Sequence, residues 1–381
     1  MLEYYQNTFD EFINEYERLH VNPWHNITKK EFKNICKELI NKIEIDDEYK
    51  FNYFMNYNIK RLSGVDDVHT KFRMRTTILP FNYRIFNDEI VVNFPEGLRG
   101  STLESINEVS VSKILKELDD IITYGTLERK RYELEKSLFD MSLLFSLPSL
   151  RESEELIFEF KTISGEIEKR TIYKRDAMTS DEQFDIEEYY YGDTGTYEIK
   201  DNTLIYRHCS VQNEYKSIIE ESVNEIRSID FNNISKNIID LRGNIGGNSE
   251  LNKLLIDFLS EHKDKKLVVL IDYIISSSGS LALYDLIKLG CVTVGEEIGT
   301  PFNSYGEQVW LDIGKYRFAV PTCYFIPSMN IKISDKYELS KLDSKIFEPV
   351  IFKPDYYVES TKEDFINNKD RVLEFALNTD L

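Results

Sequence analysis

The sequence NIIDLRGNIGG, residues 237–247, is followed after one helix length by LVVLIDYIISSSGS, residues 267–280. The runs IID and LVVLID are short, β-branched and continuously apolar, which is typical of buried parallel strands. Residues 248–262 between them have helical spacing. The order strand, helix, strand predicts a parallel sheet with right-handed crossovers.

Both predicted strands end in small residues. The glycine-rich turn at residues 243–247 lets backbone N–H groups approach a ligand closely, as an oxyanion hole requires. The serines after the second strand open a predicted helix from Ser277 to about Leu289, and the amides at a helix N-terminus favour a developing negative charge. Because sites in parallel sheets gather at the carboxyl ends of the strands, this pattern indicates a serine-nucleophile site.

Two motifs carry a family resemblance. Residues 240–247 match the signature DLRGNxGG, and residues 277–280 match a nucleophile turn written SSGE or SAAE. In both motifs the chain resembles the superfamily of the tail-specific (C-terminal processing) proteases, the tricorn core protease and the interphotoreceptor retinoid-binding protein modules. The resemblance covers most of the chain and implies an α/β fold with a ClpP/crotonase-like catalytic core, built as a parallel βαβ spiral.

The resemblance also implies roles for individual residues. Ser277 takes the place of the nucleophile. The backbone N–H groups of Gly246 or Gly247 and of Ser278 then form the oxyanion hole. Ser280 stands where the family often has Glu, so the role of that carboxylate is open in this chain.

A serine hydroxyl needs a neighbouring base to take its proton. The tail-specific branch uses a lysine some two dozen residues past the serine, and residues 294–308 contain none. The tricorn-like branch instead takes a histidine from an upstream D-x-H-T/S turn, which residues 67–70 match. We therefore expect His69 to be the base, since imidazole has a free pKa near 6.5 and exchanges protons near neutral pH.

A third residue orients the imidazolium in hydrolytic triads. The tricorn-like pattern has a glutamate before a GVxPD-like strand, and Glu348 lies at that offset in FEPVIFKPDYYV. Glu348 is therefore the candidate residue that orients the histidine. The alternative is that it is an exposed carboxylate at the start of an edge strand. Asp240 and Arg242 are interpreted as a structural pair that holds the glycine turn.

The remaining candidate residues are weighed by their surroundings. His208 and Tyr305 are candidates for substrate contact, with a hydrogen-bonded strand residue and a turn aromatic as the alternatives. His20 and His25 flank a Pro-Trp turn and are expected at the surface or in a cap.

Pattern shifts along the chain predict four parts. Residues 1–70 read as an N-terminal helical domain that ends in the DDVHT turn, and residues 71–174 as a PDZ-like module. Residues 175–195 read as a surface linker, and residues 196–381 as the serine peptidase domain. A PDZ domain binds an extended peptide in a groove along a sheet edge. In the alternative interpretation, the charged helical stretch at residues 126–147 covers that groove and the module has a structural or lid role.

Composition excludes some function classes. The 381 residues carry a net charge of −20, and no basic patch appears, which argues against nucleic-acid binding. The four cysteines are scattered without metal-ligand spacing, so neither a metal nor a cofactor is expected. No signal peptide and no membrane-spanning run are recognised, and a cytoplasmic location is the resulting expectation.

Together these patterns predict a serine endopeptidase that acts on peptide or protein substrates through an acyl-enzyme. Two alternatives stay open. One is a non-catalytic module that uses the same cleft for an apolar ligand, and the other is a pseudo-enzyme that binds peptide without turnover.

Overall fold

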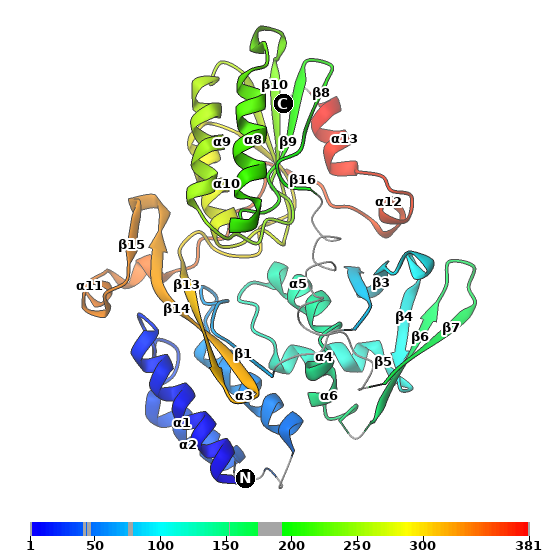
Figure 1. The fold of residues 1–381 in the computed structure, drawn as a ribbon, viewed down its shortest axis with the longest axis vertical. Helices are drawn as coiled ribbons and strands as arrows, with labels where there is room; N and C mark the ends of the chain where they lie inside the picture. Colours follow the sequence, from blue (N-terminus) through cyan, green and yellow to red (C-terminus); the bar gives the residue numbers. More distant parts are fainter. Residues whose placement is uncertain are drawn as a thin grey trace.

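The computed structural model describes residues 2–40, 43, 47–74, 79–151, 153–173 and 193–379. These residues form a mixed α/β structure with one largely parallel sheet and two antiparallel sheets (Figure 1). The predicted linker at residues 175–195 lies outside the described ranges except for residues 193–195. None of the helices in these ranges is both long and apolar enough to cross a bilayer.

The largely parallel sheet contains the two strands that the sequence predicts. Its strand order is β16-β12-β11-β10-β9-β8, and only β8 runs antiparallel to its neighbour. The strands are β8 (Tyr197–Lys200), β9 (Thr203–Arg207), β10 (Lys236–Asp240), β11 (Lys266–Ile271), β12 (Val292–Gly295) and β16 (Tyr356–Tyr357).

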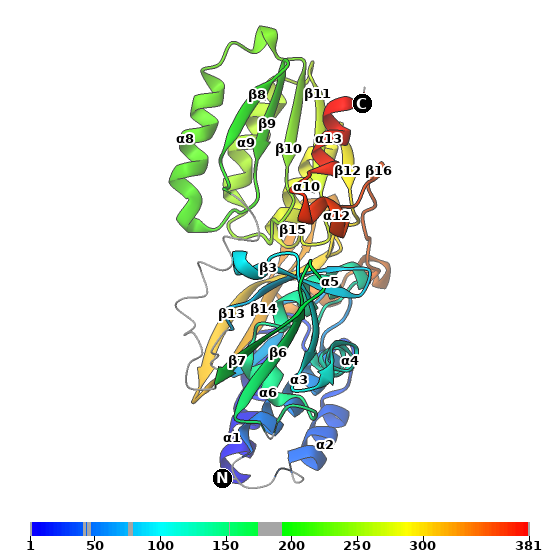
Figure 2. The ribbon, with the colours of Figure 1, turned by 90° about the vertical axis from the view of Figure 1, so that its right-hand side faces the viewer.

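Helices cover both faces of this sheet, as the continuously apolar strands require. Helices α8 (Lys216–Arg227), α9 (Glu250–Glu261) and α10 (Ser278–Lys288) pack on one face, and α13 (Arg371–Asn378) packs on the other (Figure 2). Along β10, Ile239 belongs to the first core and Ile238 to the second. The alternation of faces explains why both positions are apolar.

A second sheet pairs one strand from the N-terminal part of the chain with three strands from residues 304–333. Its strands are β1 (Lys71–Met74), β14 (Tyr316–Ile326), β13 (Ser304–Ile313) and β15 (Ile331–Ile333). Three helices pack against it in one aromatic-rich core: α1 (Leu2–Leu19), α2 (Lys29–Ile40) and α3 (Glu48–Leu62). Strand β1 was expected to open the PDZ-like module, but it pairs with β14 and so belongs to this sheet.

The third sheet has the order β2-β3-β4-β6-β7, with β5 paired to β4. Its strands are β2 (Asn82–Phe86), β3 (Glu89–Phe94), β4 (Thr102–Ile106), β5 (Val109–Ser110), β6 (Glu155–Lys161) and β7 (Ile167–Tyr173). The helices of this part are α4 (Val111–Ile121), α5 (Leu127–Ser137) and α6 (Met141–Ser146). Its PDZ-like character remains a prediction.

Short helices complete the connections. They are η1 (Glu96–Leu98), η4 (Asn213–Tyr215), η5 (Phe231–Asn233), η6 (Pro327–Met329), α11 (Lys336–Ser340), η7 (Ser344–Phe347) and α12 (Lys362–Ile366).

Candidate active site

Ser277 occupies a sharp turn between β11 and α10. Its backbone has φ 52° and ψ −126°, a conformation that residues with a side chain rarely adopt, and its carbonyl accepts the first hydrogen bond of the helix from Leu281 at 3.2 Å. Strained backbone of this kind clusters at functional sites. A strand-to-helix turn with a strained serine is also how nucleophile elbows expose the hydroxyl.

The glycine turn after β10 lies directly against Ser277. Gly246 has φ +99°, and a Cβ built there would lie 2.8 Å from both the Ser277 Cβ and the Ser278 nitrogen. A Cβ on Gly247, at φ +131°, would lie 2.5 Å from the Val211 carbonyl oxygen. Only glycine therefore allows the two turns to approach this closely.

Two backbone amides beside Ser277 are available to a ligand. The Gly246 amide donates to the Asn244 Oδ1 at 2.9 Å. The amides of Gly247 and Ser278 donate to no acceptor in the described parts of the chain. The Ser278 Oγ donates to the Gly247 carbonyl at 2.6 Å and ties the two turns together. Of the two predicted glycines, Gly247 is thus the one whose amide is free.

The DDVHT turn is held by one buried carboxylate. Asp67 accepts hydrogen bonds from the backbone amides of His69 and Thr70, at 3.1 and 3.0 Å, and from the Thr70 hydroxyl at 2.6 Å. His20 Nε2 lies 3.3 Å from the other side of this carboxylate. Burial pushes the pKa of Asp67 upward, but the hydrogen bonds from His20 and Thr70 hold it below its usual value.

The expectation that His20 lies at the surface is wrong. Its ring is fully buried between the rings of Tyr16 and Tyr305, at centroid distances of 4.9 and 4.8 Å. The contact with Asp67 explains how a polar ring is accommodated there, because a buried polar group needs a hydrogen-bonding partner.

His69 and Ser277 line one cavity of about 410 Å³. Burial lowers the pKa of His69 to about 4, so the ring is neutral and able to accept a proton at neutral pH. Its Nδ1 is buried without a hydrogen-bonding partner, and no hydrogen bond joins it to Ser277 in the described residues. Unsatisfied buried atoms are rare and need an explanation, of which a functional role is one.

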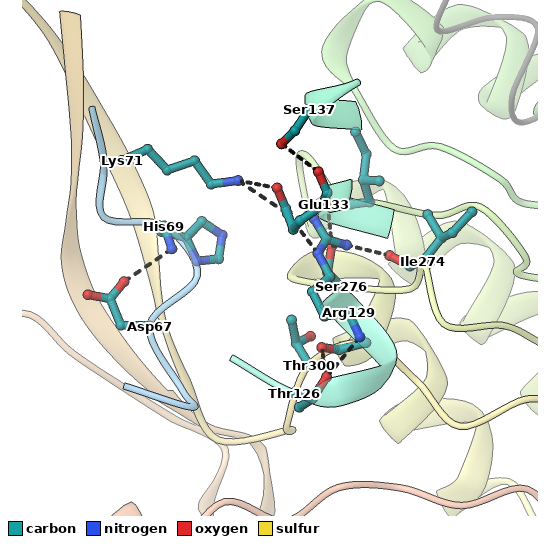
Figure 3. A network of polar contacts seen from close by, with 12 residues as sticks. Asp67, His69, Lys71, Thr126, Arg129, Glu133, Ser137, Ile274, Ser276 and Thr300 are labelled. Atoms are coloured by element: carbon teal, nitrogen blue, oxygen red, sulfur yellow. Dashed lines mark hydrogen bonds and ion pairs between the residues drawn. The ribbon is translucent and has the colours of Figure 1, made fainter. Parts of the chain in front are cut away.

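A polar network from β1 and α5 lies beside His69 (Figure 3). Glu133 accepts from Lys71 Nζ at 3.2 Å and from Arg129 Nε at 2.9 Å. Arg129 also donates to the Ile274 carbonyl at 2.8 Å and to the Ser276 Oγ at 3.2 Å. Helix α5 therefore holds the loop that immediately precedes Ser277.

The sequence analysis missed Lys71 and Arg73, which also line the cavity. The sequence contains a pattern that could have predicted them. Side chains alternate along a strand, so Lys71 and Arg73 share one face of β1, which begins two residues after His69. Phe72 is buried on the opposite face against the aromatic core. Arg129 and Glu133 are four residues apart, the spacing of facing pairs on a helix.

Of three other predicted site residues, two lie outside the cavity and one lines it. Glu348 ends η7 as an exposed residue and does not line the cavity, so the structure does not bring it to His69. His208 is buried outside the cavity, where its Nε2 lies 2.9 Å from the Asn252 Oδ1. Tyr305 does line the cavity, but its hydroxyl accepts a hydrogen bond from Asn22 at 3.1 Å.

The pairing predicted for Asp240 and Arg242 is present. Arg242 donates to Asp240 at 2.7 and 2.8 Å and to Asp370, the N-cap residue of α13, at 2.7 and 2.8 Å. It therefore fixes the start of the glycine turn to the C-terminal helix. Among the described residues, no cluster of three or more His, Cys, Asp or Glu side chains is placed to bind a metal ion.

Known structures resemble this chain over nearly its full length. An alanine mutant of CPAF aligns with a TM-score of 0.62 at 10% identity, covering 99% of this chain and 98% of that one. Mature CPAF aligns with a TM-score of 0.58 at 10% identity and covers 88% of each chain. The photosystem II D1 C-terminal processing protease aligns with a TM-score of 0.43 at 11% identity, over 94% of this chain and 93% of that one. This chain has the fold of these CPAF structures.

The predicted family resemblance is thus confirmed at the level of the fold. The mixed α/β architecture with its largely parallel sheet agrees with the predicted α/β fold class. No protein-family model matches the chain, and no curated protein matches it by sequence.

Proposed function

We propose that this chain is a serine peptidase of the tricorn-like type. The observation that carries the proposal is the arrangement around one cavity: a strained serine, a neutral histidine and two free amides. The fold supports it because the glycine turn and the Ser277 turn follow the parallel strands β10 and β11, and sites in such sheets gather at the carboxyl ends of the strands. His69 reaches the same cavity from the DDVHT turn.

The proposed reaction follows from the roles of these groups. The Ser277 Oγ attacks the peptide carbonyl carbon while the imidazole of His69 takes the hydroxyl proton. The carbonyl oxygen becomes negative and accepts hydrogen bonds from the amides of Gly247 and Ser278. His69 then gives its proton to the leaving amine, which leaves an acyl-enzyme on Ser277. Water, deprotonated by His69, releases the acid and restores the serine.

The orienting role predicted for Glu348 gains no support from its exposed position, and we leave it out of the proposed mechanism. Asp67 acts on His69 through the backbone, because its carboxylate accepts from the His69 amide. We therefore assign Asp67 as a positioning residue.

The test is cleavage of a mixture of unrelated peptides, with products identified by mass spectrometry. The proposal predicts cleavage by the unaltered chain and a loss of at least about a thousandfold for Ser277→Ala and for His69→Ala. Ser260→Ala, an exposed position on α9, serves as the matched control. Equal cleavage by Ser277→Ala would exclude Ser277 as the nucleophile.

A peptide-binding scaffold without turnover is the second candidate. It is favoured by the lack of a hydrogen bond between His69 and Ser277 in the described residues. Such a scaffold would yield no cleavage products in this assay. It would still bind peptides, and its affinity for them would be insensitive to His69→Ala.

A further inference from the structure

The cavity beside Ser277 carries an excess of positive charge. Four cationic side chains line it, two from β1 and two from α5: Lys71, Arg73, Arg129 and Lys136. Among the described residues, the one carboxylate in its lining is Glu307, which is exposed and pairs with Lys332 at 2.5 Å. The wall around the serine is therefore cationic.

One carboxylate behind the wall offsets part of this charge. Glu133 bonds Lys71 and Arg129, and it is buried. Burial raises the pKa of Glu133, but the surrounding cations, Lys71 first, lower it to about 2. Glu133 thus lies among four cations, and burial together with cationic neighbours lowers the pKa of Lys71 to about 8.

Arg73 is the cation of this cluster that has the fewest protein partners. Its guanidinium lies over the Trp310 ring, 5.6 Å from the centroid, and no carboxylate pairs with it in the described residues. Trp310 lines the same cavity. Stacking on an aromatic ring leaves the edge of a guanidinium free to donate to a carboxylate.

This cationic wall contrasts with the rest of the protein, whose net charge is −20. Like charges held together in a partly buried cavity repel one another, and a bound anion relieves that repulsion. A local field of opposite sign to the whole protein therefore selects for an anionic group at this place.

We propose that the cavity beside Ser277 binds a carboxylate of the substrate, with Arg73 as a specificity-determining residue. The carboxylate belongs to an Asp or Glu side chain of the peptide. This inference rests on the proposed function, which places a peptide in the cavity. A carboxylate there forms charge-assisted hydrogen bonds with Arg73 and is attracted by the other three cations.

Binding to the full chain carrying Ser277→Ala tests the proposal without turnover. Rhodamine-labelled peptides of one length would be compared by fluorescence anisotropy: amidated peptides with Gln, Lys or Glu scanned through each position, and the Gln peptide with a free carboxyl end. We expect a carboxylate at its best position to tighten Kd about tenfold over the amidated Gln peptide. The gain should shrink at high salt.

Arg73→Gln in the same background should remove most of that tenfold gain. Arg317→Gln is the matched control, because Arg317 lies over the same Trp310 ring at 4.6 Å but does not line the cavity, and it should keep the gain. A gain with the Glu peptides supports the proposal, and a gain confined to the free carboxyl end would overturn it.

Equal affinities for all peptides, no binding of any peptide, or a gain that survives Arg73→Gln would overturn the proposal. A failure of the proposed function is distinguishable from this. If the unaltered chain cleaves no peptide but the Ser277→Ala chain still prefers carboxylates through Arg73, the carboxylate site stands and the peptidase does not.

Discussion

The chemistry proposed for this protein depends on two side chains held in unusual states. Ser277 has a backbone conformation at φ 52°, which costs free energy unless the surrounding structure enforces it. His69 has a buried Nδ1 without a partner and a pKa lowered to about 4. Both states are unfavourable for folding, so a role in the reaction is the simplest reason for their presence.

The lowered pKa of His69 predicts the pH dependence of the reaction. The base must be neutral to accept the serine proton, and a lowered pKa extends the neutral form toward acid. Cleavage should therefore stay constant from about pH 8 to pH 5 and fall below about pH 4, as measured by kcat/KM for a small peptide.

Circular dichroism at each pH separates this titration from unfolding. An acidic limb centred at pH 6.5 or above would contradict the environment assigned to His69, whose charged neighbours are Asp67, Lys71, Arg129 and Glu133.

At the scale of elements, the glycine turn after β10 contacts the serine turn after β11, and this contact positions the backbone amides of the site. The turn after β10 brings Gly246 against the first residues of α10, with no room for a Cβ. Their contact brings Gly247 and Ser278 together with Ser277 in the lining of one cavity.

Replacing one glycine tests this contact. Gly246→Ala should lower the free energy of unfolding by about 3 kcal/mol, because the added Cβ is strained and overpacked. It should also lower kcat/KM about a hundredfold by displacing Ser277 and Ser278. The measurements are urea denaturation and peptide cleavage.

Gly290→Ala is the control for the strain alone. Gly290 also has positive φ, +85°, but a Cβ there would meet nothing within 4 Å. It should cost about 1 kcal/mol and leave cleavage unchanged. Equal effects of the two substitutions would show that close approach of the turns is unimportant.

The elements near the motifs were predictable from sequence. Strands β10 and β11 are predicted by continuous apolar runs, which need packing partners on both faces of the sheet. The glycine turn is predicted by small residues that allow the backbone to approach a ligand closely. Lys71 and Arg73 were predictable as well, since alternation along β1 puts both on one face of a strand that begins two residues after His69.

At the scale of the whole molecule, the site is assembled from four distant segments. The DDVHT turn and β1 come from the N-terminal part, and α5 comes from the third-sheet part. The glycine turn and the serine turn come from the parallel sheet, and β13 adds residues such as Trp310. Local patterns do not specify how such segments meet. The positions of α5 and of Glu348 depend on tertiary packing, which is why the first was missed and the second was expected beside His69.

Arg242 shows how such long-range contacts hold the molecule together. Arg242→Met should cost about 3 to 5 kcal/mol of unfolding free energy, because it leaves the buried Asp240 without its partner and releases Asp370 at α13. The exposed pair of Arg227 with Glu261 gives the control. Arg227→Met should cost less than about 1 kcal/mol in the same denaturation experiment, and similar losses for both would contradict this account.

The most direct test of the central claim is covalent labelling of the intact chain by a fluorophosphonate, followed by peptide mapping. The account predicts one adduct, on Ser277, absent in Ser277→Ala and formed at least about a thousandfold more slowly in His69→Ala. Equal labelling of the unaltered chain and Ser277→Ala, or an adduct mapped to another residue, would contradict it.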